Sequence, residues 1–334
     1  MTEKYHVYGL GNALVDIEIE LTDAELQRLN VEKGMMTLID FNRHHELLTH
    51  VQGSTHNRAC GGSAANSTIA VAQLGGNSFY SCRIGNDETG DFYLMDLHRE
   101  GVDSNLDKVA REDGVTGKCL VMITPDAERS MNTFLGITTD MSPTCLDLDA
   151  LAQSRYLYIE GYLAASEQAV ETANIAIEHA QKNQVKVAIS LSDISMIEFC
   201  RAGLDNMLSR KIDMIFANEQ EAMAYTGTDN LDAAQEQLKE ISHASAITLG
   251  EKGAIIFDGE NSCHVDAHTV DAIDTNGAGD LFAGAYLYGI SHGYSAENAA
   301  KLASYASGIL VTQFGPRLNQ AFIDQVKEYG QTVA

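Results

Sequence analysis

Short apolar runs alternate along the chain with longer stretches in which apolar positions recur at helical spacing. The short runs are typical of buried strands, and the amphipathic stretches are typical of helices that cover a sheet. We expect strands over residues 6–10, 78–84, 156–159, 186–191, 214–217 and 244–249. We expect helices over residues 63–74, 88–99, 167–182 and 231–241, and a mostly helical end from Gly279 onward. This alternation predicts βαβ units, and therefore an α/β fold with a mainly parallel sheet and helices on both faces.

Two segments, residues 15–40 and 118–138, depart from this alternation. Residues 17–21 alternate strictly between apolar and polar side chains, and short apolar-rich runs cover 36–39, 119–123 and 131–134. Such patterns are typical of half-exposed antiparallel strands. We expect them to form a small β-sheet inserted into the larger domain as a lid. The alternative is a set of extra edge strands on the main sheet.

The composition indicates a folded and acidic protein. The chain has 334 residues, of which 45% are hydrophobic, so it can bury a sizeable core. It carries 22 Lys and Arg residues against 47 Asp and Glu residues, a formal net charge of −25. Because nucleic acids and anionic membranes are bound through basic surfaces, we expect neither as a partner. The chain has 3 Pro residues and no linker-like stretch, so we expect one large domain with a satellite.

The cysteine and histidine residues indicate no metal site and no redox pair. The 6 Cys residues form no C-x-x-C pair. The spacing of His44, His45, His50, His56 and Cys60 fits no standard metal site, and we interpret this segment as a solvated helix and loop. We find no secretory signal pattern and no apolar run long enough to cross a bilayer, so we expect a cytoplasmic protein.

Three familiar motifs are incomplete or missing. Residues 9–14 begin like a dinucleotide fingerprint, but Leu14 replaces the third glycine, which argues against a NAD-dependent dehydrogenase. The chain contains no G-x-x-x-x-G-K-[ST] phosphate-binding loop. Residues 61–65 lack the last glycine of a G-x-S-x-G nucleophile elbow.

The segment 274–280, with the sequence DTNGAGD, joins an expected strand to a helix rich in small residues. Its glycines leave backbone N–H groups unobstructed at the positive end of the helix dipole, which predicts an anion site. A carboxylate there opposes anion binding unless it has a task, such as accepting a proton from an attacking hydroxyl. We therefore predict that Asp280 is a general base. The alternative is an Asp that caps the helix after a glycine turn.

Polar residues also follow two later strands. Asn218 and Glu221 come after the fifth expected strand, where ligands bind in an open α/β sheet, and they suit the hydration shell of a Mg²⁺ ion. Thr248, Gly250 and Gly253 follow the next strand, where glycines would let a nucleotide lie against the backbone. The alternatives are the start of a helix at Asn218 and a simple turn at Gly250.

Two places near the N-terminal end carry further polar groups. Asn12 and Asp16 flank the first strand, and Gly61, Gly62 and Asn66 form a second glycine turn that enters a helix. These groups suit the hydroxyls of a sugar, because a buried Asn or Asp is otherwise costly. Taken singly, each residue is more often part of a cap or a turn.

Together these segments resemble the ribokinase-like PfkB carbohydrate kinase family. Residues 61–66 through Gly75 and Gly76 are similar to its N-terminal signature, and residues 274–280 are similar to its C-terminal signature. The motifs occur in the same order, and the resemblance covers nearly the whole chain. It implies a three-layer α/β/α domain over residues 1–334, with a β-sheet lid formed by insertions at about 13–58 and 105–140.

The resemblance also implies an ATP-dependent phosphotransferase that acts on a CH₂OH group of a sugar-like molecule. Asp280 would be the general base, and the amides of Gly277, Ala278 and Gly279 would stabilise charge on the transferred phosphoryl group. The residues that the resemblance assigns to ATP binding are Asn218, Thr248, Gly250, Gly253, Asp274, Gly277 and Gly279.

The same resemblance implies two kinds of metal ion. Asn218 and Glu221 match an N-x-x-E motif that holds Mg²⁺ through water. Many members also use a monovalent cation such as K⁺ near Asp274, although here Asn276 stands where Thr or Gly is more usual. Some members pair through their lids, so we expect a monomer or a homodimer.

Within the family, several segments are similar to those of adenosine kinases. Residues 11–16 match a G-N-x-x-x-D segment in which Asn and Asp contact the ribose, and residues 129–136 and 158–163 resemble segments of bacterial members. The residues that this likeness assigns to acceptor binding are Asn12, Asp16, Gly61, Gly62, Asn66, Arg129, Phe134 and Tyr162.

Three of these side chains have open alternatives. Phe134 or Tyr162 would stack on the base, or both would be core aromatics. Arg129 would reach the phosphates when the lid closes, or it would be an ordinary arginine on the lid surface. The resulting hypothesis is a kinase that phosphorylates the 5′-hydroxyl of a nucleoside, with adenosine favoured. A sugar kinase of the same fold and a catalytically silent nucleotide-binding sensor are the alternatives.

Overall fold

One large β-sheet runs through the centre of the protein, in a computed structural model that describes residues 3–51, 56–126 and 128–334. Its strands are β1 (Tyr5–Leu10), β5 (Ser78–Ser81), β8 (Ser154–Glu160), β9 (Lys186–Ser190), β10 (Ile212–Asn218), β11 (Ser242–Thr248), β12 (Ala254–Phe257) and β13 (Ser262–Val265). The order across the sheet is β13-β12-β11-β10-β9-β8-β1-β5. The strands from β11 to β5 are parallel, and β12 and β13 extend the sheet by antiparallel pairing.

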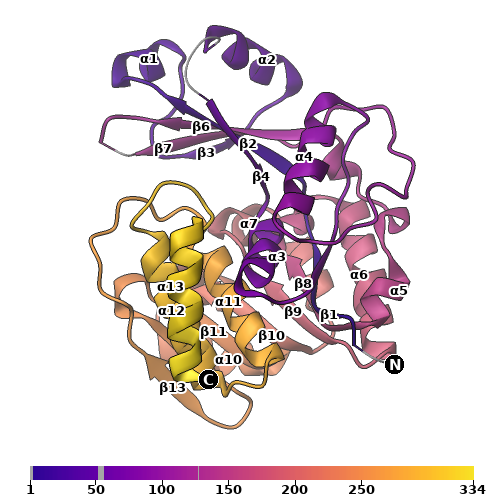
Figure 1. Ribbon diagram of the computed structural model, residues 1–334, viewed down its shortest axis with the longest axis vertical. Helices are drawn as coiled ribbons and strands as arrows, with labels where there is room; N and C mark the ends of the chain where they lie inside the picture. The colour runs from indigo at the N-terminus through magenta and orange to yellow at the C-terminus, as the bar shows by residue number, and fades with distance from the viewer. Residues whose placement is uncertain (1–2, 52–55, 127) are drawn as a thin grey trace.

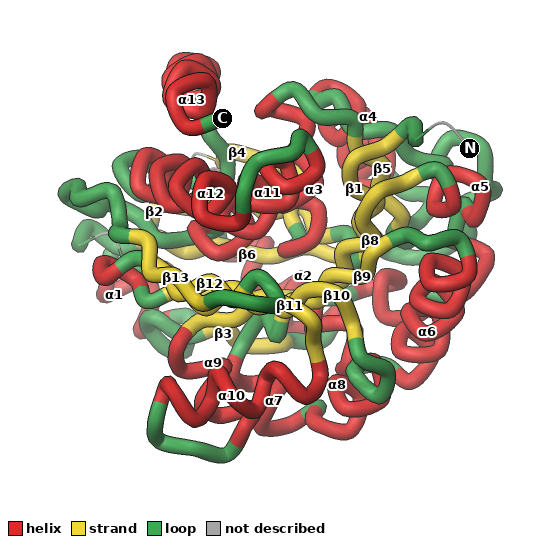
Figure 2. Tube along the Cα trace, turned by 90° about the horizontal axis from the view of Figure 1, so that it is seen from below, coloured by secondary structure: helices red, strands yellow, loops and turns green. Residues whose placement is uncertain are grey.

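Helices cover both faces of this sheet, as Figure 2 shows. One face carries α3 (Ser63–Leu74), α11 (Ala278–Ser291) and α12 (Ala296–Leu310), with α13 (Gln320–Val333) packed against α12. The other face carries α5 (Leu148–Ala152), α6 (Glu167–Lys182), α7 (Ile194–Phe199), α8 (Arg201–Met207), α9 (Glu219–Thr226) and α10 (Leu231–Ile241). Short 3₁₀ turns occupy η1 (Gly136–Asp140), η2 (Pro143–Cys145), η3 (Gly161–Ala165) and η4 (Gly250–Lys252).

The central strands are apolar because both of their faces are buried. Tyr158 and Phe216 project toward α11, and the Phe216 ring meets Tyr286 of that helix edge-on at 5.7 Å between centroids. Their neighbours Leu157 and Ile215 project into the core under the opposite helices. This arrangement accounts for the short apolar runs in the sequence.

A second, smaller sheet lies above the large one in Figure 1. Its strands are β2 (Leu14–Glu20), β3 (Met36–Leu38), β4 (His56–Gly61), β6 (Gly117–Ile123) and β7 (Arg129–Phe134), in the order β3-β7-β6-β2-β4. Two helices, α1 (Asp23–Arg28) and α2 (Phe41–His50), cover its outer face, and α4 (Glu88–Arg99) packs against β4. A separate sheet was the expected arrangement, and the alternative of extra edge strands on the main sheet is wrong.

The expectation of a purely antiparallel small sheet is also wrong. β2 pairs with β6 in parallel, as β3 does with β7, whereas β6–β7 and β2–β4 are antiparallel. The alternation of apolar and polar residues reports that one face is buried, here by Leu26 and Leu47 of the covering helices against Ile19 and Met122. It carries no information on the direction of the neighbouring strand.

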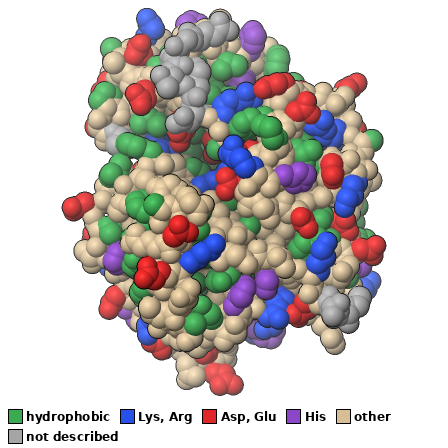
Figure 3. Space-filling model, viewed as in Figure 1, with side chains coloured by type: hydrophobic (Ala, Val, Ile, Leu, Met, Phe, Trp, Pro, Cys, Tyr) green, Lys and Arg blue, Asp and Glu red, His purple; other side chains and the backbone are tan. Residues whose placement is uncertain are grey.

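The main strands and helices predicted from the sequence are confirmed, with small differences at their ends. β5 stops at Ser81 rather than at residue 84, and residues 266–277 form loops and turns instead of the strand expected before the DTNGAGD segment. Across the described ranges, no helix is long and apolar enough to cross a membrane. On the face seen in Figure 3, basic side chains are interspersed with acidic ones.

The expectation of a solvated segment around the clustered histidines is wrong for two residues. His44 on α2 and Cys60 on β4 are both buried. The His44 ring lies 5.6 Å from the Phe134 ring, so it contributes to packing beneath α2. The side chain of His56 lies outside the described residues. In the part of the chain that is described, no group of three His, Cys, Asp or Glu residues is arranged to hold a metal ion.

Candidate active site

The first turns of α3 and α11 meet at Asp280. The Oδ1 atom of Asp280 accepts a hydrogen bond from Ser63 Oγ at 2.6 Å, and its Oδ2 atom accepts one from Asn66 Nδ2 at 3.0 Å. The N-cap of α11 is Gly277, so the alternative that Asp280 caps its own helix is wrong. The carboxylate is instead held by a helix from the other end of the chain.

Two opposing effects act on the pKa of Asp280. Burial raises the pKa, and the hydrogen bonds from Ser63 and Asn66 lower it, with a net increase over the ordinary value. Each carboxylate oxygen has further lone pairs beyond these bonds. An ionised Asp280 is therefore able to accept a proton from a nearby hydroxyl.

The backbone at the start of α11 presents free N–H groups. Gly277 adopts φ 74°, and a Cβ atom there would lie 2.6 Å from Cβ of Pro316, so only glycine fits without strain. The amide of Ala278 already donates to the Thr275 carbonyl at 3.2 Å. The amide of Gly279 belongs to the N–H groups at a helix start that have no partner within the helix. These amides form an electropositive corner beside Asp280.

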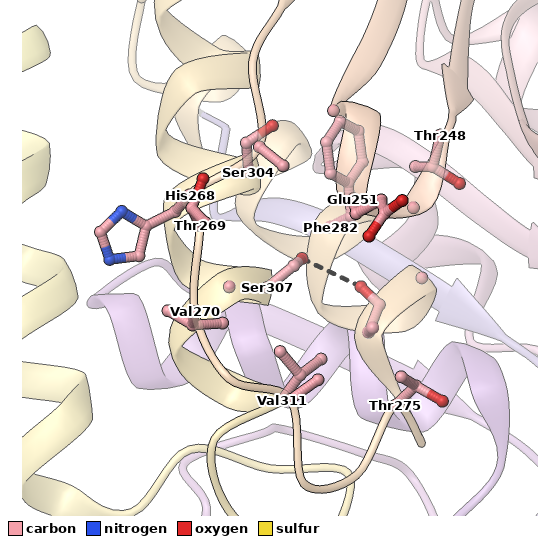
Figure 4. A pocket seen from close by; sticks show the side chains of 17 residues that line it. Thr248, Glu251, His268, Thr269, Val270, Thr275, Phe282, Ser304, Ser307 and Val311 are labelled. Atoms are coloured by element: carbon pink, nitrogen blue, oxygen red, sulfur yellow. Dashed lines mark hydrogen bonds between the residues drawn. The ribbon is translucent and has the colours of Figure 1, made fainter.

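A pocket of about 390 Å³ opens next to this corner (Figure 4). Thr248, Gly250 and Gly253 lie on one side of it, and Thr275 and Gly279 lie where it meets α11. Of the residues predicted to bind ATP, the structure thus brings Thr248, Gly250, Gly253 and Gly279 together, whereas Asn218, Asp274 and Gly277 do not line this pocket. The alternative of a turn between two strands is confirmed, because the glycine segment joins β11 to β12. Its contact with a nucleotide stays a prediction.

Sequence motifs did not mark most of the pocket wall. The additional lining side chains include His268, Thr269, Val270, Phe282, Ser304, Ser307 and Val311. They come from the loop before α11 and from the consecutive helices α11 and α12. The lining surface of the whole pocket is mainly apolar, which suits the faces of a flat ring such as a nucleotide base.

The predicted acceptor residues at the N-terminal end are also adjacent. A Cβ atom on Gly61 would lie 2.5 Å from Oδ2 of Asp16, and one on Gly62, which has φ 102°, would lie 2.2 Å from the Asn12 carbonyl oxygen. The two glycines therefore let the start of α3 approach Asn12 and Asp16 closely. Burial raises the pKa of Asp16 to about 7, against the lowering effect of Arg317.

Sequence reasoning missed Glu160 and Ser63 as parts of the site. Glu160 is buried at the carboxyl end of β8 and accepts hydrogen bonds from the amides of Asn12 and Ala64, both at 2.8 Å. Burial raises its pKa to about 7. The signal was a polar residue directly after a buried strand, the same rule that marked Asn218. Ser63 directly follows the glycine turn.

Asn66 contributes a second polar atom to the site. Its Nδ2 atom is bonded to Asp280, whereas its buried Oδ1 atom has no hydrogen-bond partner among the described residues. An unpaired buried oxygen is costly, and a hydroxyl donated by a ligand would satisfy it.

The three remaining side chains that were predicted to bind the acceptor lie in different parts of the structure. Phe134 on β7 contacts Phe41 at 5.8 Å and lies under α2. Tyr162 in η3 is half-buried, and burial with the nearby carboxylates of Asp193 and Asp280 raises its pKa. Arg129 has 9% of its side chain exposed, so the alternative of an ordinary lid-surface arginine is wrong.

Asn218 and Glu221 form the first turn of α9, which confirms the alternative that they begin a helix. The side chain of Asn218 accepts from the Glu221 amide at 2.8 Å, and the Glu221 carboxylate accepts from the amide of Asn218 at 3.0 Å. Burial, together with the nearby carboxylates of Asp193 and Asp280, raises the pKa of Glu221 to about 7. This concentration of acidic oxygens suits a hydrated divalent cation.

Comparison with known proteins gives a consistent result. Residues 31–321 match the model of the pfkB family of carbohydrate kinases. A probable sugar kinase from Rhizobium etli has 33% sequence identity and a TM-score of 0.89, with 99% of both chains covered. An adenosine kinase from Sinorhizobium meliloti has 34% identity and a TM-score of 0.88, covering 98% of this chain and 99% of that one. Adenosine kinase from Saccharomyces cerevisiae is 26% identical over 92% of this chain and 95% of its own.

Proposed function

The chain belongs to the pfkB family of carbohydrate kinases and is a phosphotransferase with a hydroxyl acceptor, and on that basis we propose that it transfers the γ-phosphate of ATP to the 5′-hydroxyl of adenosine. One observation carries the proposal. Asp280 is held by Ser63 and Asn66 beside the free amide of Gly279, where a pocket of nucleotide size opens. A proton acceptor beside an anion site is what in-line phosphoryl transfer requires.

The proposed reaction begins with the acceptor hydroxyl against Asp280. The carboxylate accepts the hydroxyl proton while the oxygen attacks the γ-phosphorus of ATP, and ADP leaves with the electrons of the broken P–O bond. Amides of Gly277, Ala278 and Gly279 stabilise the charge on the transferred phosphoryl group. Because Ala278 already donates to Thr275, Gly279 is the best placed of the three.

The ATP side of the site uses the pocket beside α11. The base and ribose would lie against Thr248, Gly250 and Gly253, and the phosphates would point toward Gly279 at the start of α11. The assignment of Asp274 to ATP binding rests on the resemblance alone. A contact of Arg129 with the phosphates rests on the resemblance alone, because in the structure its guanidinium pairs with the Asp274 carboxylate.

Asn218 and Glu221 are the proposed residues for Mg²⁺. Their oxygens would hold it through water, in keeping with the acidic surroundings of Glu221. When bound, Mg²⁺ neutralises charge on the ATP phosphates. The existing bonds between Asn218 and Glu221 fix the orientation of both side chains.

The proposed acceptor site lies between the small sheet and α3. Asn12 and Asp16 would bind the ribose hydroxyls, Gly61 and Gly62 allow the close approach, and Asn66 offers its unpaired oxygen. The similarity to two adenosine kinases across nearly the full chain supports adenosine. The proposed contacts of Phe134 and Tyr162 with the base rest on the resemblance alone.

A sugar kinase of the same fold is the second candidate, favoured by the similarity to the probable sugar kinase from R. etli. A coupled assay of ADP release with adenosine, other nucleosides, ribose and fructose separates the two. Turnover with adenosine supports the proposal, and turnover with a free sugar alone contradicts it. No turnover with any acceptor, despite ATP binding, supports the catalytically silent sensor.

A further inference from the structure

A buried ion pair connects the small sheet to the loop that precedes α11. Arg129 is the first residue of β7, and Asp274 opens the DTNGAGD segment. The distance from Arg129 Nη2 to Asp274 Oδ2 is 2.5 Å, and the two side chains are 9% and 3% exposed. A carboxylate at this depth requires a positive charge close by.

Asp274 is the centre of a fully formed network. Its Oδ1 atom accepts from the amide of Asn276 at 3.0 Å, and its Oδ2 atom accepts from the amide of Gly315 at 2.8 Å. The amides of Ile273 and Asp274 itself both donate to the Val311 carbonyl. Both carboxylate oxygens therefore accept hydrogen bonds from N–H groups. The bond from the Gly315 amide joins the loop of Asp274 to the loop of Gly315 without any added group.

The guanidinium of Arg129 is enclosed by groups that suit a cation. The Glu18 carboxylate lies 3.8 Å from Nη1 on the more exposed side, and the ring of Phe314 lies 5.8 Å away. A guanidinium keeps its charge at every physiological pH. The residues around Asp274 consequently do not fit a separate monovalent cation, because N–H donors and a fixed positive charge already occupy the carboxylate.

We propose that Arg129 is a built-in replacement for the monovalent cation that the family resemblance implies. Arg129 is a positioning residue, since it neutralises Asp274 and thereby holds residues 274–276 and the adjoining amides of the anion site in place. Phosphoryl transfer by this protein would then be independent of K⁺. The inference rests on the proposed phosphotransfer for its activity readout only.

The first experiment compares the full-length protein in KCl and in tetramethylammonium chloride. At a constant ionic strength of about 0.1 M, kcat and the KM for ATP are expected to agree within about twofold in the two salts. Activation of the wild-type protein by K⁺ of about tenfold or more would overturn the proposal.

Variants at Arg129 provide the second experiment. Arg129→Gln is expected to lower kcat by about tenfold or more, and K⁺ or guanidinium ions are expected to restore part of the loss. Arg129→Lys keeps a charge and is expected to stay insensitive to K⁺. Arg201→Gln, which removes a guanidinium from an exposed pair with Asp205, is the matched control with unchanged kcat. An Arg129→Gln protein that neither cation restores would show a purely structural role and overturn the proposal.

A third measurement needs no acceptor and no turnover. The Tm of Arg129→Gln is expected to rise with added K⁺ relative to tetramethylammonium, whereas the wild-type Tm is expected to stay constant. If no acceptor is phosphorylated, the proposed function fails while this Tm series still decides the role of Arg129. Equal K⁺ responses of the wild-type protein and Arg129→Gln would contradict it.

Discussion

The hydroxyl of Ser63 donates a hydrogen bond to Oδ1 of Asp280 across 2.6 Å. The bond joins the first residue of α3 to the third residue of α11, which are 217 positions apart in the chain. It holds the proposed base in one orientation and favours its charged form. The acceptor side and the phosphate side of the site therefore share one carboxylate.

Removal of that bond is expected to shift the pH dependence of catalysis. The bond lowers the pKa of Asp280, so in Ser63→Ala the pKa rises, and the acidic limb of the kcat/KM profile moves to higher pH. The measurement is a pH–rate profile of both proteins. Ser67→Ala is the control, because Ser67 bonds to the backbone carbonyl of Asp280 rather than to its carboxylate. Superimposable acidic limbs for Ser63→Ala and wild type would count against Asp280 as the base.

Substitution of the base itself is expected to remove most of the activity. Asp280→Asn keeps the size of the side chain but loses the proton acceptor, so kcat should fall by about 10²–10⁴. ATP binding, measured by calorimetry, should persist because the amides and the pocket remain. Near-normal turnover of Asp280→Asn would assign the base to another group.

Gly277 is expected to tolerate no side chain. Gly277→Ala places a Cβ atom 2.6 Å from Pro316 in a left-handed conformation, which costs about 1–2 kcal/mol before the clash is counted. Both Tm and kcat should fall. Gly227→Ala is the matched control, since Gly227 has φ 69° with no atom within 4 Å of the added Cβ. A Tm loss no larger than that of the control would show that Pro316 does not restrict this turn.

The buried carboxyl of Glu160 is expected to make stability depend on pH. Its pKa rises from 4.5 to about 7 on folding, so the folded protein holds a proton that the unfolded chain releases. This contribution is complete below the unfolded pKa and is lost as the pH rises through about 7.

The test of this effect is Tm as a function of pH. Between about pH 5 and pH 8 the Tm of Glu160→Gln should fall less than that of the wild-type protein, because glutamine does not titrate. Glu178→Gln removes an exposed carboxyl of α6 and should keep the wild-type dependence. Parallel curves for wild type and Glu160→Gln would exclude Glu160 as the titrating group.

ATP binding is expected to require Mg²⁺. The protein carries a net charge of −25. The carboxylates of Asp193 and Asp280 lie near Glu221 and add negative charge to its surroundings. Without the cation, the ATP phosphates would meet this charge unshielded, so the Kd should rise by about tenfold or more in EDTA. Calorimetry with and without Mg²⁺ measures the change, and equal Kd values would contradict the assignment of Asn218 and Glu221.

The sequence predicted the large sheet well for a physical reason. Strands buried on both faces, such as β8 and β10, leave uninterrupted apolar runs. β4 was missed because His56–Gly61 contains few apolar residues and lies at an edge of the small sheet. The directions of the strands in the small sheet could not be predicted from the sequence either, because each strand pairs with partners that are distant in the chain.

The sequence predicted those parts of the candidate site in which the reactive side chain and the glycine turn belong to the same short segment. Gly277 and Asp280 lie in one short segment, so the roles proposed for them could be predicted from the order of residues. Ser63 and Glu160 act through partners more than 90 positions away, and no local pattern reveals such pairs. The lining residues Phe282 and Val311 belong to different parts of the chain and come together only on folding.

The path of the chain between the two sheets has an evolutionary consequence. β1 leads into β2 through residues 11–13, and β4 leads into α3 through Gly62 alone. Two connections of the small sheet are therefore very short, and they carry the proposed contacts Asn12 and Gly62, while Asp280 and Gly277 lie on the helix side of the large sheet. Under the proposed function, such a division would let the acceptor contacts change by insertion and substitution in the small sheet while Asp280 keeps its surroundings in the large domain.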